Sequence, residues 1–183
     1  MIIAGFSGVG KTELAKKYSN VIDLDSAPYV YDDSDMLDIP FEERKGKNRT
    51  LNKEWPLNYI KDIKEAVNKY DYVLVWDRED IIKEYKLNNL DFVLCYPDKS
   101  DLVYYEQRYR KRGNTEEYIK WKLKQYEEKL EFYNSLPNKK IILKDNEYLE
   151  DYFIKKDFKL IKKGEYYDSY LWFWWNTYTI SFT

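Results

Sequence analysis

Histidine is absent from the sequence, and cysteine occurs once, at Cys95. The lack of histidine removes the commonest general base, the commonest transition-metal ligand and every Ser-His or Cys-His catalytic arrangement. A single cysteine forms neither an intramolecular disulfide nor a thiolate zinc site, which fits a reducing compartment.

Long apolar runs are missing as well. The longest apolar cluster, Tyr170 to Trp175, is far too short to span a bilayer. The chain begins with Met-Ile-Ile-Ala, which is followed by a glycine-rich segment. A signal peptide would instead begin with a basic region followed by an apolar stretch. We therefore expect a cytoplasmic protein with no membrane partner.

An excess of positive charge is also lacking, because 31 Lys and Arg stand against 33 Asp and Glu, for a net charge of -2. Proteins that coat DNA or RNA neutralise phosphates with a surplus of basic residues. Nucleic acid is therefore not the expected partner, although local basic patches are left open.

The 183 residues correspond to one domain.

Short apolar segments alternate with segments of helical spacing along the chain. Strands are expected at residues 1–4, 20–24, 72–76, 92–96 and 140–143, and helices at 11–18, 57–69, 78–86, 101–112, 115–134 and 147–153. Continuous apolar strands suit a parallel sheet covered on both faces, and the alternation implies right-handed crossovers. We predict an α/β fold in three layers, with a mainly parallel five-stranded sheet and helices on both faces.

Two segments do not fit this alternation. Residues 27–55 are polar and contain Pro28, Pro40 and Gly46, so we interpret them as an inserted loop or small lid on the substrate side. Residues 154–183 follow the predicted core of residues 1–153 and include Trp172 to Trp175. This aromatic extension either folds back as an extra strand or forms an interface, for example in a homodimer.

One motif lies between the first strand and the first helix. Gly5-Phe-Ser-Gly-Val-Gly-Lys-Thr12 matches G-x-x-x-x-G-K-[ST], in which glycines let backbone N–H groups close on phosphate oxygens. Lys11 would add a charge at the β- and γ-phosphates, and Thr12 would offer a hydroxyl to Mg²⁺. The motif predicts a P-loop NTPase fold whose nucleotide-binding residues are Gly5, Ser7, Gly8, Val9, Gly10, Lys11 and Thr12.

Acidic residues follow two of the expected strands. Asp25 either accepts a proton from an acceptor hydroxyl, orients the acceptor and Mg²⁺, or caps the following turn. Asp23, one pleat earlier, is expected to face another environment. Asp77 ends an apolar strand as in a Walker B arrangement, so it either holds Mg²⁺ through water or caps the helix at 78–86.

Arginines supply the expected mobile positive charge. Arg78 could reach an acceptor phosphate or base, or form a surface salt bridge. Arg108 and Arg112 share a helix face and could converge on one anion, with Arg110 pointing elsewhere. Residues 104–115 are therefore interpreted as an arginine lid, against the alternative of a solvated basic face. Asn114 is the expected N-cap of the next helix, with Glu117 three residues on.

These positions together resemble the nucleoside monophosphate kinases, and residues 105–119 are similar to the guanylate kinase lid. A guanine-reading Asn-Lys-x-Asp motif is absent, which argues against a GTPase. Residues 2–12 at the start of the chain and residues 21–26, Val-Ile-Asp-Leu-Asp-Ser, are also similar to segments of small kinase-like proteins of bacteriophages and their Gram-positive hosts. The expected location is therefore the cytoplasm of a bacterial or phage-infected host cell. The resemblance covers residues 1–153.

The resemblance implies ATP as donor, Mg²⁺, and a nucleotide or nucleoside-type acceptor. Lys11, Arg108 and Arg112 would stabilise the transferred phosphoryl group, while residues 27–55 grip the acceptor through Arg44, Lys47, Arg49 and Trp55. The Asp-Gly-Phe-Pro-Arg sequence of adenylate kinases is absent, so the acceptor is open.

Two alternatives remain. Val21 to Asp25 also resembles the strand of polynucleotide and other hydroxyl kinases, whose terminal Asp is a general base; the acceptor would then be a nucleoside or modified DNA. The other alternative is a non-catalytic, nucleotide-responsive binding protein that recruits a partner through its aromatic tail.

Overall fold

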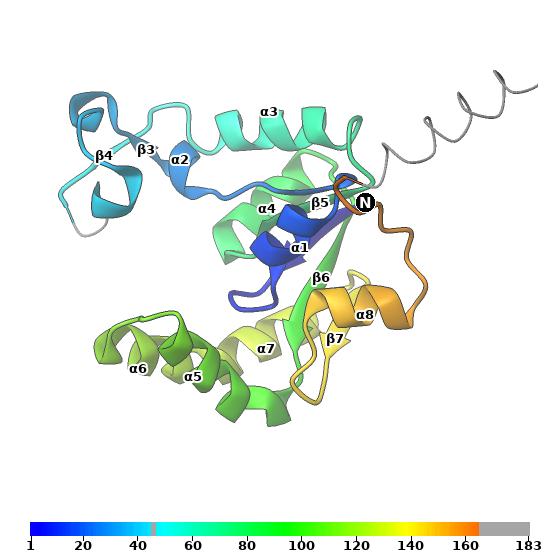
Figure 1. Ribbon diagram of the computed structural model, residues 1–183. Coiled ribbons are helices and arrows are strands. Elements are labelled where there is room, and N and C mark those ends of the chain that lie inside the picture. The colour runs from blue at the N-terminus through cyan, green and yellow to red at the C-terminus, as the bar shows by residue number, and fades with distance from the viewer. Residues whose placement is uncertain (45–46, 165–183) are drawn as a thin grey trace, which may run out of the picture.

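The computed structural model describes residues 1–44 and 47–164 (Figure 1). The expected aromatic extension, including Trp172 to Trp175, lies largely outside these residues. Neither prediction for that tail is therefore addressed by the structure.

A five-stranded parallel sheet forms the centre of the fold. Its order is β2-β5-β1-β6-β7, and all four neighbouring pairs run parallel. The strands are β1 (Ile2–Gly5), β2 (Val21–Asp23), β5 (Tyr72–Trp76), β6 (Phe92–Pro97) and β7 (Lys140–Leu143). β1 and the apolar part of β5 are buried along their length because helices cover both faces, as the continuous apolar sequence predicts.

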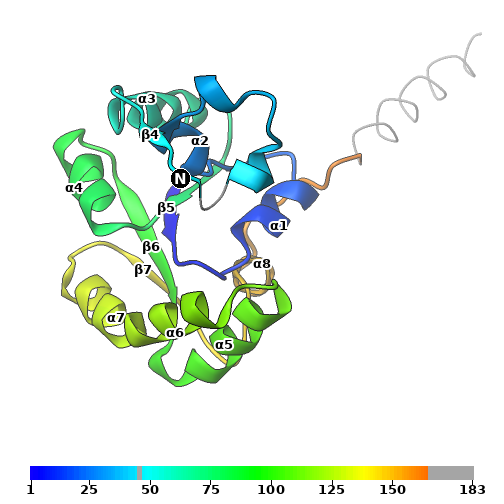
Figure 2. The ribbon, with the colours of Figure 1, turned by 90° about the vertical axis from the view of Figure 1, so that its left-hand side faces the viewer.

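The helices complete three layers and confirm the predicted fold class. Figure 2 shows α1 and α8 on one side of the sheet and α3, α4 and α7 on the other. The helices of the core and the arginine segment are α1 (Lys11–Lys17), α3 (Leu57–Ala66), α4 (Glu79–Leu87), α5 (Leu102–Lys111), α6 (Glu116–Lys124), α7 (Tyr126–Ser135) and α8 (Leu149–Lys155), with a 3₁₀ turn at η3 (Lys99–Asp101).

The long helix expected at 115–134 is two helices, α6 and α7. Gln125 both ends α6 and precedes α7, and its φ and ψ are -87° and -4°. The expected N-cap at Asn114 is also wrong, because the Thr115 hydroxyl accepts the bond from the Tyr118 N–H. The Asn114 N–H instead donates to the Tyr109 carbonyl and so belongs to the end of α5.

The inserted segment is a small folded unit and not only a loop. It contains α2 (Ala27–Val30), the antiparallel pair β3 (Tyr31–Asp32) and β4 (Thr50–Leu51), and two 3₁₀ turns, η1 (Ser34–Met36) and η2 (Phe41–Arg44). Figure 2 shows this unit and the α5–α6 pair on opposite sides of the strand ends. The two units therefore flank the edge of the sheet where β1 leads into its loop.

Packing continues past residue 153, where the core was expected to end. The Phe158 ring stacks on Phe153 with centroids 4.5 Å apart and an interplanar angle of 8°. Farther on, the Ser19 N–H donates to the Ile161 carbonyl at 2.7 Å, and the Lys163 N–H donates to the Lys17 carbonyl at 2.9 Å. The described residues after α8 therefore cover the end of α1 and the approach to the edge strand β2.

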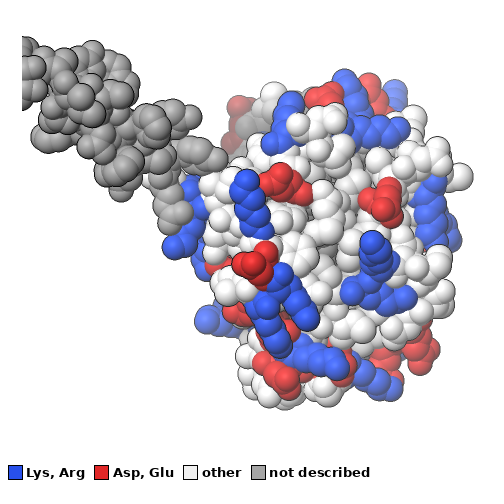
Figure 3. Space-filling model, turned by 90° about the vertical axis from the view of Figure 1, so that its right-hand side faces the viewer, with Lys and Arg blue, Asp and Glu red and all other residues white. Residues whose placement is uncertain are grey.

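Charge on the face shown in Figure 3 is mixed, with basic and acidic side chains interspersed. That face carries no broad area of one sign. Within the described part of the chain, none of the helices combines the length and apolar character needed to cross a bilayer.

Replacing Phe158 with Ala is expected to lower the free energy of unfolding by about 2 kcal/mol or more, because it removes a ring packed on the core. The matched control is Ile154→Ala, which truncates a side chain that is 63% exposed and should change stability by no more than about 0.5 kcal/mol. Urea denaturation measures both. Equal effects would contradict the view that the residues after α8 belong to the folded core.

Candidate functional site

The loop between β1 and α1 has a backbone that only glycine adopts easily at two positions. Gly8 and Gly10 have φ values of +101° and +95°. A Cβ at Gly8 would lie 3.1 Å from the Tyr105 ring, and one at Gly10 would lie 3.1 Å from the Tyr148 ring. Conformation and space therefore both require glycine in this loop.

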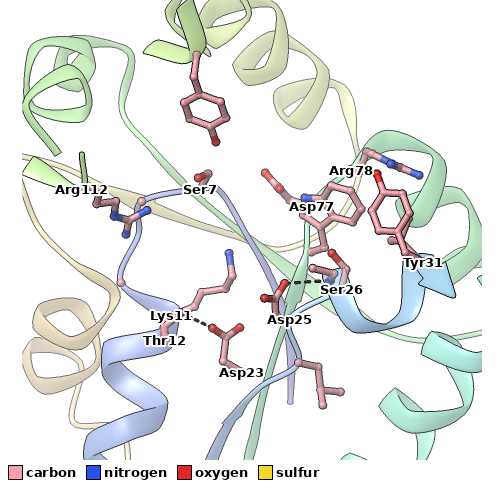
Figure 4. Close-up of a pocket in the computed structure, with 17 residues that line it drawn as sticks. Ser7, Lys11, Thr12, Asp23, Asp25, Ser26, Tyr31, Asp77, Arg78 and Arg112 are labelled. Atoms are coloured by element: carbon pink, nitrogen blue, oxygen red, sulfur yellow. Dashed lines mark hydrogen bonds between the residues drawn. The ribbon is translucent and has the colours of Figure 1, made fainter. Parts of the chain in front are cut away.

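The two side chains that end the motif make internal contacts. The Lys11 ammonium group donates to the Gly5 carbonyl at 2.5 Å, so it lies across its own loop. The Thr12 hydroxyl donates to the Asp23 carboxylate at 2.7 Å (Figure 4). Both groups face a cavity of about 570 Å³, within the range of small-molecule sites.

The cavity brings most of the predicted site residues together. Ser7, Gly8, Gly10, Lys11, Thr12, Asp25, Asp77, Arg78 and Arg112 line it, together with Asp23, Leu24, Ser26, Ala27, Val30, Tyr31, Trp76 and Tyr118. Figure 4 shows Lys11 pointing into the space between Ser7, Asp25 and Asp77. Carboxylates and cations from four separate chain segments thus meet beside the glycine-rich loop.

Asp23 faces the cavity, and not the separate environment expected for it. It lines the cavity with Asp25, and burial raises the pKa of its carboxyl, while the Lys11 charge and the Thr12 hydrogen bond oppose that shift. Alternate residues of an extended segment share a face. The pair Asp23 and Asp25, two residues apart, already carried the signal that both face the same space.

Asp25 caps the following turn and also lines the cavity. Its Oδ1 accepts from the Ala27 N–H at 3.1 Å, so the carboxylate does cap the turn. It also lines the cavity, and the side chain is exposed. Capping and contact with a ligand are compatible because one oxygen is enough for the turn.

Asp77 does not cap the following helix. α4 begins after Arg78 without a side-chain cap. Asp77 is only 2% exposed, and its Oδ2 accepts from the Tyr133 hydroxyl at 2.5 Å. The Lys129 ammonium group lies 3.7 Å from the same oxygen. The carboxylate is therefore held by α7.

Arg78 lies at the cavity but has an acidic partner. Its Nε donates to Asp80 at 2.5 Å, and its guanidinium carbon lies 4.4 Å from the Trp76 ring centroid. Trp55 stacks on Tyr59 with ring centroids 5.7 Å apart. It is not among the residues that line the cavity. The salt-bridge alternative for Arg78 is thus present in the structure, together with access to the cavity.

The structure does not bring the arginines of the insertion to the cavity. Both arginines form ion pairs with Asp33: the Arg44 Nη1 lies 3.2 Å and the Arg49 Nη2 2.5 Å from its Oδ2. Neither arginine lines the cavity. Lys47 is exposed and likewise absent from the lining. Because both guanidinium groups pair with Asp33, they stabilise the fold of the inserted segment, residues 27–55.

Arg108 and Arg112 do not converge as their spacing predicted. Arg112 is exposed and lines the cavity. Arg108 is 6% exposed and donates at 2.9 Å to the Gly8 carbonyl, and at 2.8 Å and 3.0 Å to the Asn146 and Glu147 carbonyls. Arg108 therefore fastens the glycine-rich loop to the segment before α8, and only Arg112 of the pair faces the open space.

Arg108→Gln is expected to lower the free energy of unfolding by about 3 kcal/mol, because it leaves the buried Gly8 carbonyl and two partly buried carbonyls without their charged donor. Arg112→Gln, one helical turn away and exposed, should change stability by no more than about 0.5 kcal/mol. Chemical denaturation of both variants measures this difference. A loss at Arg112 as large as that at Arg108 would contradict the assigned roles.

Asp23→Asn is expected to change how stability depends on pH. Since burial raises the pKa of Asp23, its favourable contribution is present below the unfolded-state pKa of about 3.9 and is lost as pH rises through the folded-state value. The Asn variant should therefore gain stability relative to the native protein as the pH rises above about 4.

Urea denaturation at several pH values tests this, with Asp35→Asn at an exposed position as the control. A stability deficit of the Asp23 variant that grows with pH would contradict the expected sign.

No protein-family model matches this chain, and no curated protein matches its sequence significantly.

Proposed function

We propose that this protein transfers a phosphoryl group from ATP, with Mg²⁺, to a nucleotide acceptor, as nucleoside monophosphate kinases do. The observation that carries the proposal is the continuity of the cavity, which runs from Lys11 and Thr12 of the glycine-rich loop to Asp25 and Arg78. Phosphoryl transfer needs the donor phosphates and the acceptor in one space, with cations around the transferred group.

The donor side is built from the glycine-rich loop. The Lys11 ammonium group, now on the Gly5 carbonyl, would exchange that partner for phosphate oxygens. Thr12 and Asp23 place two oxygens 2.7 Å apart, which suits Mg²⁺, a cation that prefers oxygen ligands and completes its shell with phosphate and water. When bound, the ion would neutralise charge on the phosphates.

Few protein ligands are needed for such an ion. Residues 1–44 and 47–164 contain no group of three or more acidic or cysteine side chains placed to hold a metal. Thr12 and Asp23 would hold Mg²⁺ together with the nucleotide, because Mg²⁺ in such sites is usually bound by one or two protein groups plus substrate phosphates.

The acceptor side is supported by a cation and two aromatic side chains. Arg78 would bind an acceptor phosphate after leaving Asp80, and Trp76 and Tyr31 in the same wall offer surfaces on which a base can stack. Arg112, on the opposite wall, would supply positive charge over the transferred group.

Asp25 favours a second candidate, a hydroxyl kinase in which this carboxylate is the general base. Its Oδ1 is engaged by the Ala27 N–H and the side chain is exposed in the cavity, so it is accessible to an acceptor hydroxyl. Such an acceptor would be a nucleoside or a modified DNA. A nucleotide-responsive binding protein without catalysis is the third candidate.

A screen of nucleoside mono- and diphosphates, nucleosides and oligonucleotides for ADP release tests the proposal. At least one monophosphate is expected to stimulate turnover, and Lys11→Ala should lower ATP affinity about 100-fold, a loss of about 2.7 kcal/mol. ATP binding without turnover on any acceptor would favour the binding protein. Native ATP affinity in the Lys11 variant would reject nucleotide binding at this loop.

The same assay separates the two kinase candidates. For a hydroxyl acceptor, Asp25→Asn should remove most of kcat because the general base is lost. For a monophosphate acceptor, which is already an anion, the variant should mainly raise KM. Asp35→Asn, at an exposed position in η1, is the matched control.

A further inference from the structure

Lys129 on α7 forms an ion pair with Asp77, which lines the cavity, although Lys129 itself is not among the lining residues. Its ammonium group lies 3.7 Å from the Asp77 Oδ2 and 5.5 Å from the centroid of Phe6, a residue of the glycine-rich loop. The Lys129 side chain is 28% exposed, while the Asp77 side chain is 3% exposed. A partly solvated lysine thus reaches a buried carboxylate next to the loop.

The contact between them is an ion pair without a short hydrogen bond. At 3.7 Å the nitrogen and oxygen are beyond ordinary hydrogen-bond distance. Asp77 receives its short hydrogen bond from the Tyr133 hydroxyl, at 2.5 Å. Lys129 can therefore leave without removing the hydrogen-bond donor of the buried carboxylate.

A second lysine, Lys122 of α6, lies close enough to this ion pair to feel its charges. Lys122 of α6 has its pKa lowered by burial and then by the charges of Lys129 and Lys11, while Asp77 raises it. The Lys122 ammonium group also lies over the rings of Tyr118 and Trp121. Lys11, Lys122 and Lys129 therefore repel one another beside the cavity, and an anion bound between them would offset that repulsion.

We propose that Lys129 is a phosphate-binding residue, which rests on Asp77 in the ligand-free protein and turns to the terminal phosphate of a bound nucleoside triphosphate. The inference rests on the proposed nucleotide binding and deepens it. Lysine suits this exchange because its ammonium group is a point charge on a flexible stem.

The same geometry gives Asp77 a different role from the one its Walker B-like position predicts. The Lys129 ammonium group and the Tyr133 hydroxyl both contact the Asp77 Oδ2, so a metal ion at that oxygen would compete with them. Thr12 and Asp23 hold two oxygens on the other side of the cavity. In this proposal Asp77 is the positioning residue for Lys129, and Mg²⁺ is left to Thr12 and Asp23.

Calorimetric titration of the full chain with ATP and with ADP, each with Mg²⁺, tests the inference. Lys129→Gln is expected to weaken ATP binding about tenfold and ADP binding much less, since ADP lacks the terminal phosphate. Lys129→Arg should restore most of the ATP affinity. Lys124→Gln, an exposed lysine at the end of α6, is the matched control and should bind both nucleotides as the native protein does.

Unchanged ATP affinity in a folded Lys129→Gln variant would overturn the inference while leaving nucleotide binding intact. Equal losses for ATP and ADP would also overturn it, because they would place Lys129 away from the terminal phosphate. Failure of the native protein to bind ATP would instead reject the proposed function itself.

Asp77→Asn provides a second measurement. If Asp77 only holds Lys129, this variant should keep the native dependence of ATP affinity on Mg²⁺ concentration. A lost Mg²⁺ dependence would assign the metal to Asp77 and overturn the inference. Should the variant fail to fold, the comparison of Lys129→Gln with Lys124→Gln still decides.

Discussion

The glycine-rich loop keeps its shape because one buried guanidinium group ties it to a distant part of the chain. Arg108 donates to the Gly8 carbonyl and to two carbonyls before α8, and its guanidinium carbon lies 3.8 Å from the Tyr148 ring centroid. Burying a cation is costly unless its donors find acceptors, and in Arg108 the two terminal nitrogens do so while the buried Nε has no partner among the described residues. The loop, α5 and the segment before α8 therefore stabilise one another. Together they determine the shape of the cavity at the loop.

Tyrosine connects the apolar core to the polar edge of the sheet. The sequence contains 20 tyrosines, and several buried ones place the ring in the core and the hydroxyl on a backbone carbonyl near a strand end or in the loop. These contacts are Tyr59 to Leu24, Tyr85 to Trp76, Tyr109 to Ser7 and Tyr126 to Asp98. Leaving a buried hydroxyl without a partner, as at Tyr105 within the described part of the chain, is costly, so each of these bonds helps to fix the position of a helix against the edge that carries the site.

Three cations in or beside the cavity already have a partner within the protein. Lys11 rests on a carbonyl, Arg78 on Asp80 and Lys129 on Asp77. Binding of a polyanion would exchange these partners rather than create every interaction anew. The gain from each contact is then the difference between two partners, which favours a ligand with several phosphates over one with a single charge.

The alternation of elements, the parallel sheet and the glycine-rich loop are predictable from residue order, because they depend on the spacing of apolar residues and on glycine at positions of positive φ. Tertiary structure alone decided which cations face the cavity. Helical spacing paired Arg108 with Arg112, but only the fold brings the carbonyls of Gly8 and Glu147 to Arg108. Asp33 likewise takes Arg44 and Arg49, and α7 brings Lys129 to Asp77. Local periodicity indicates which side chains share a face, whereas the partners of Arg108 and Lys129 come from segments far away in the chain.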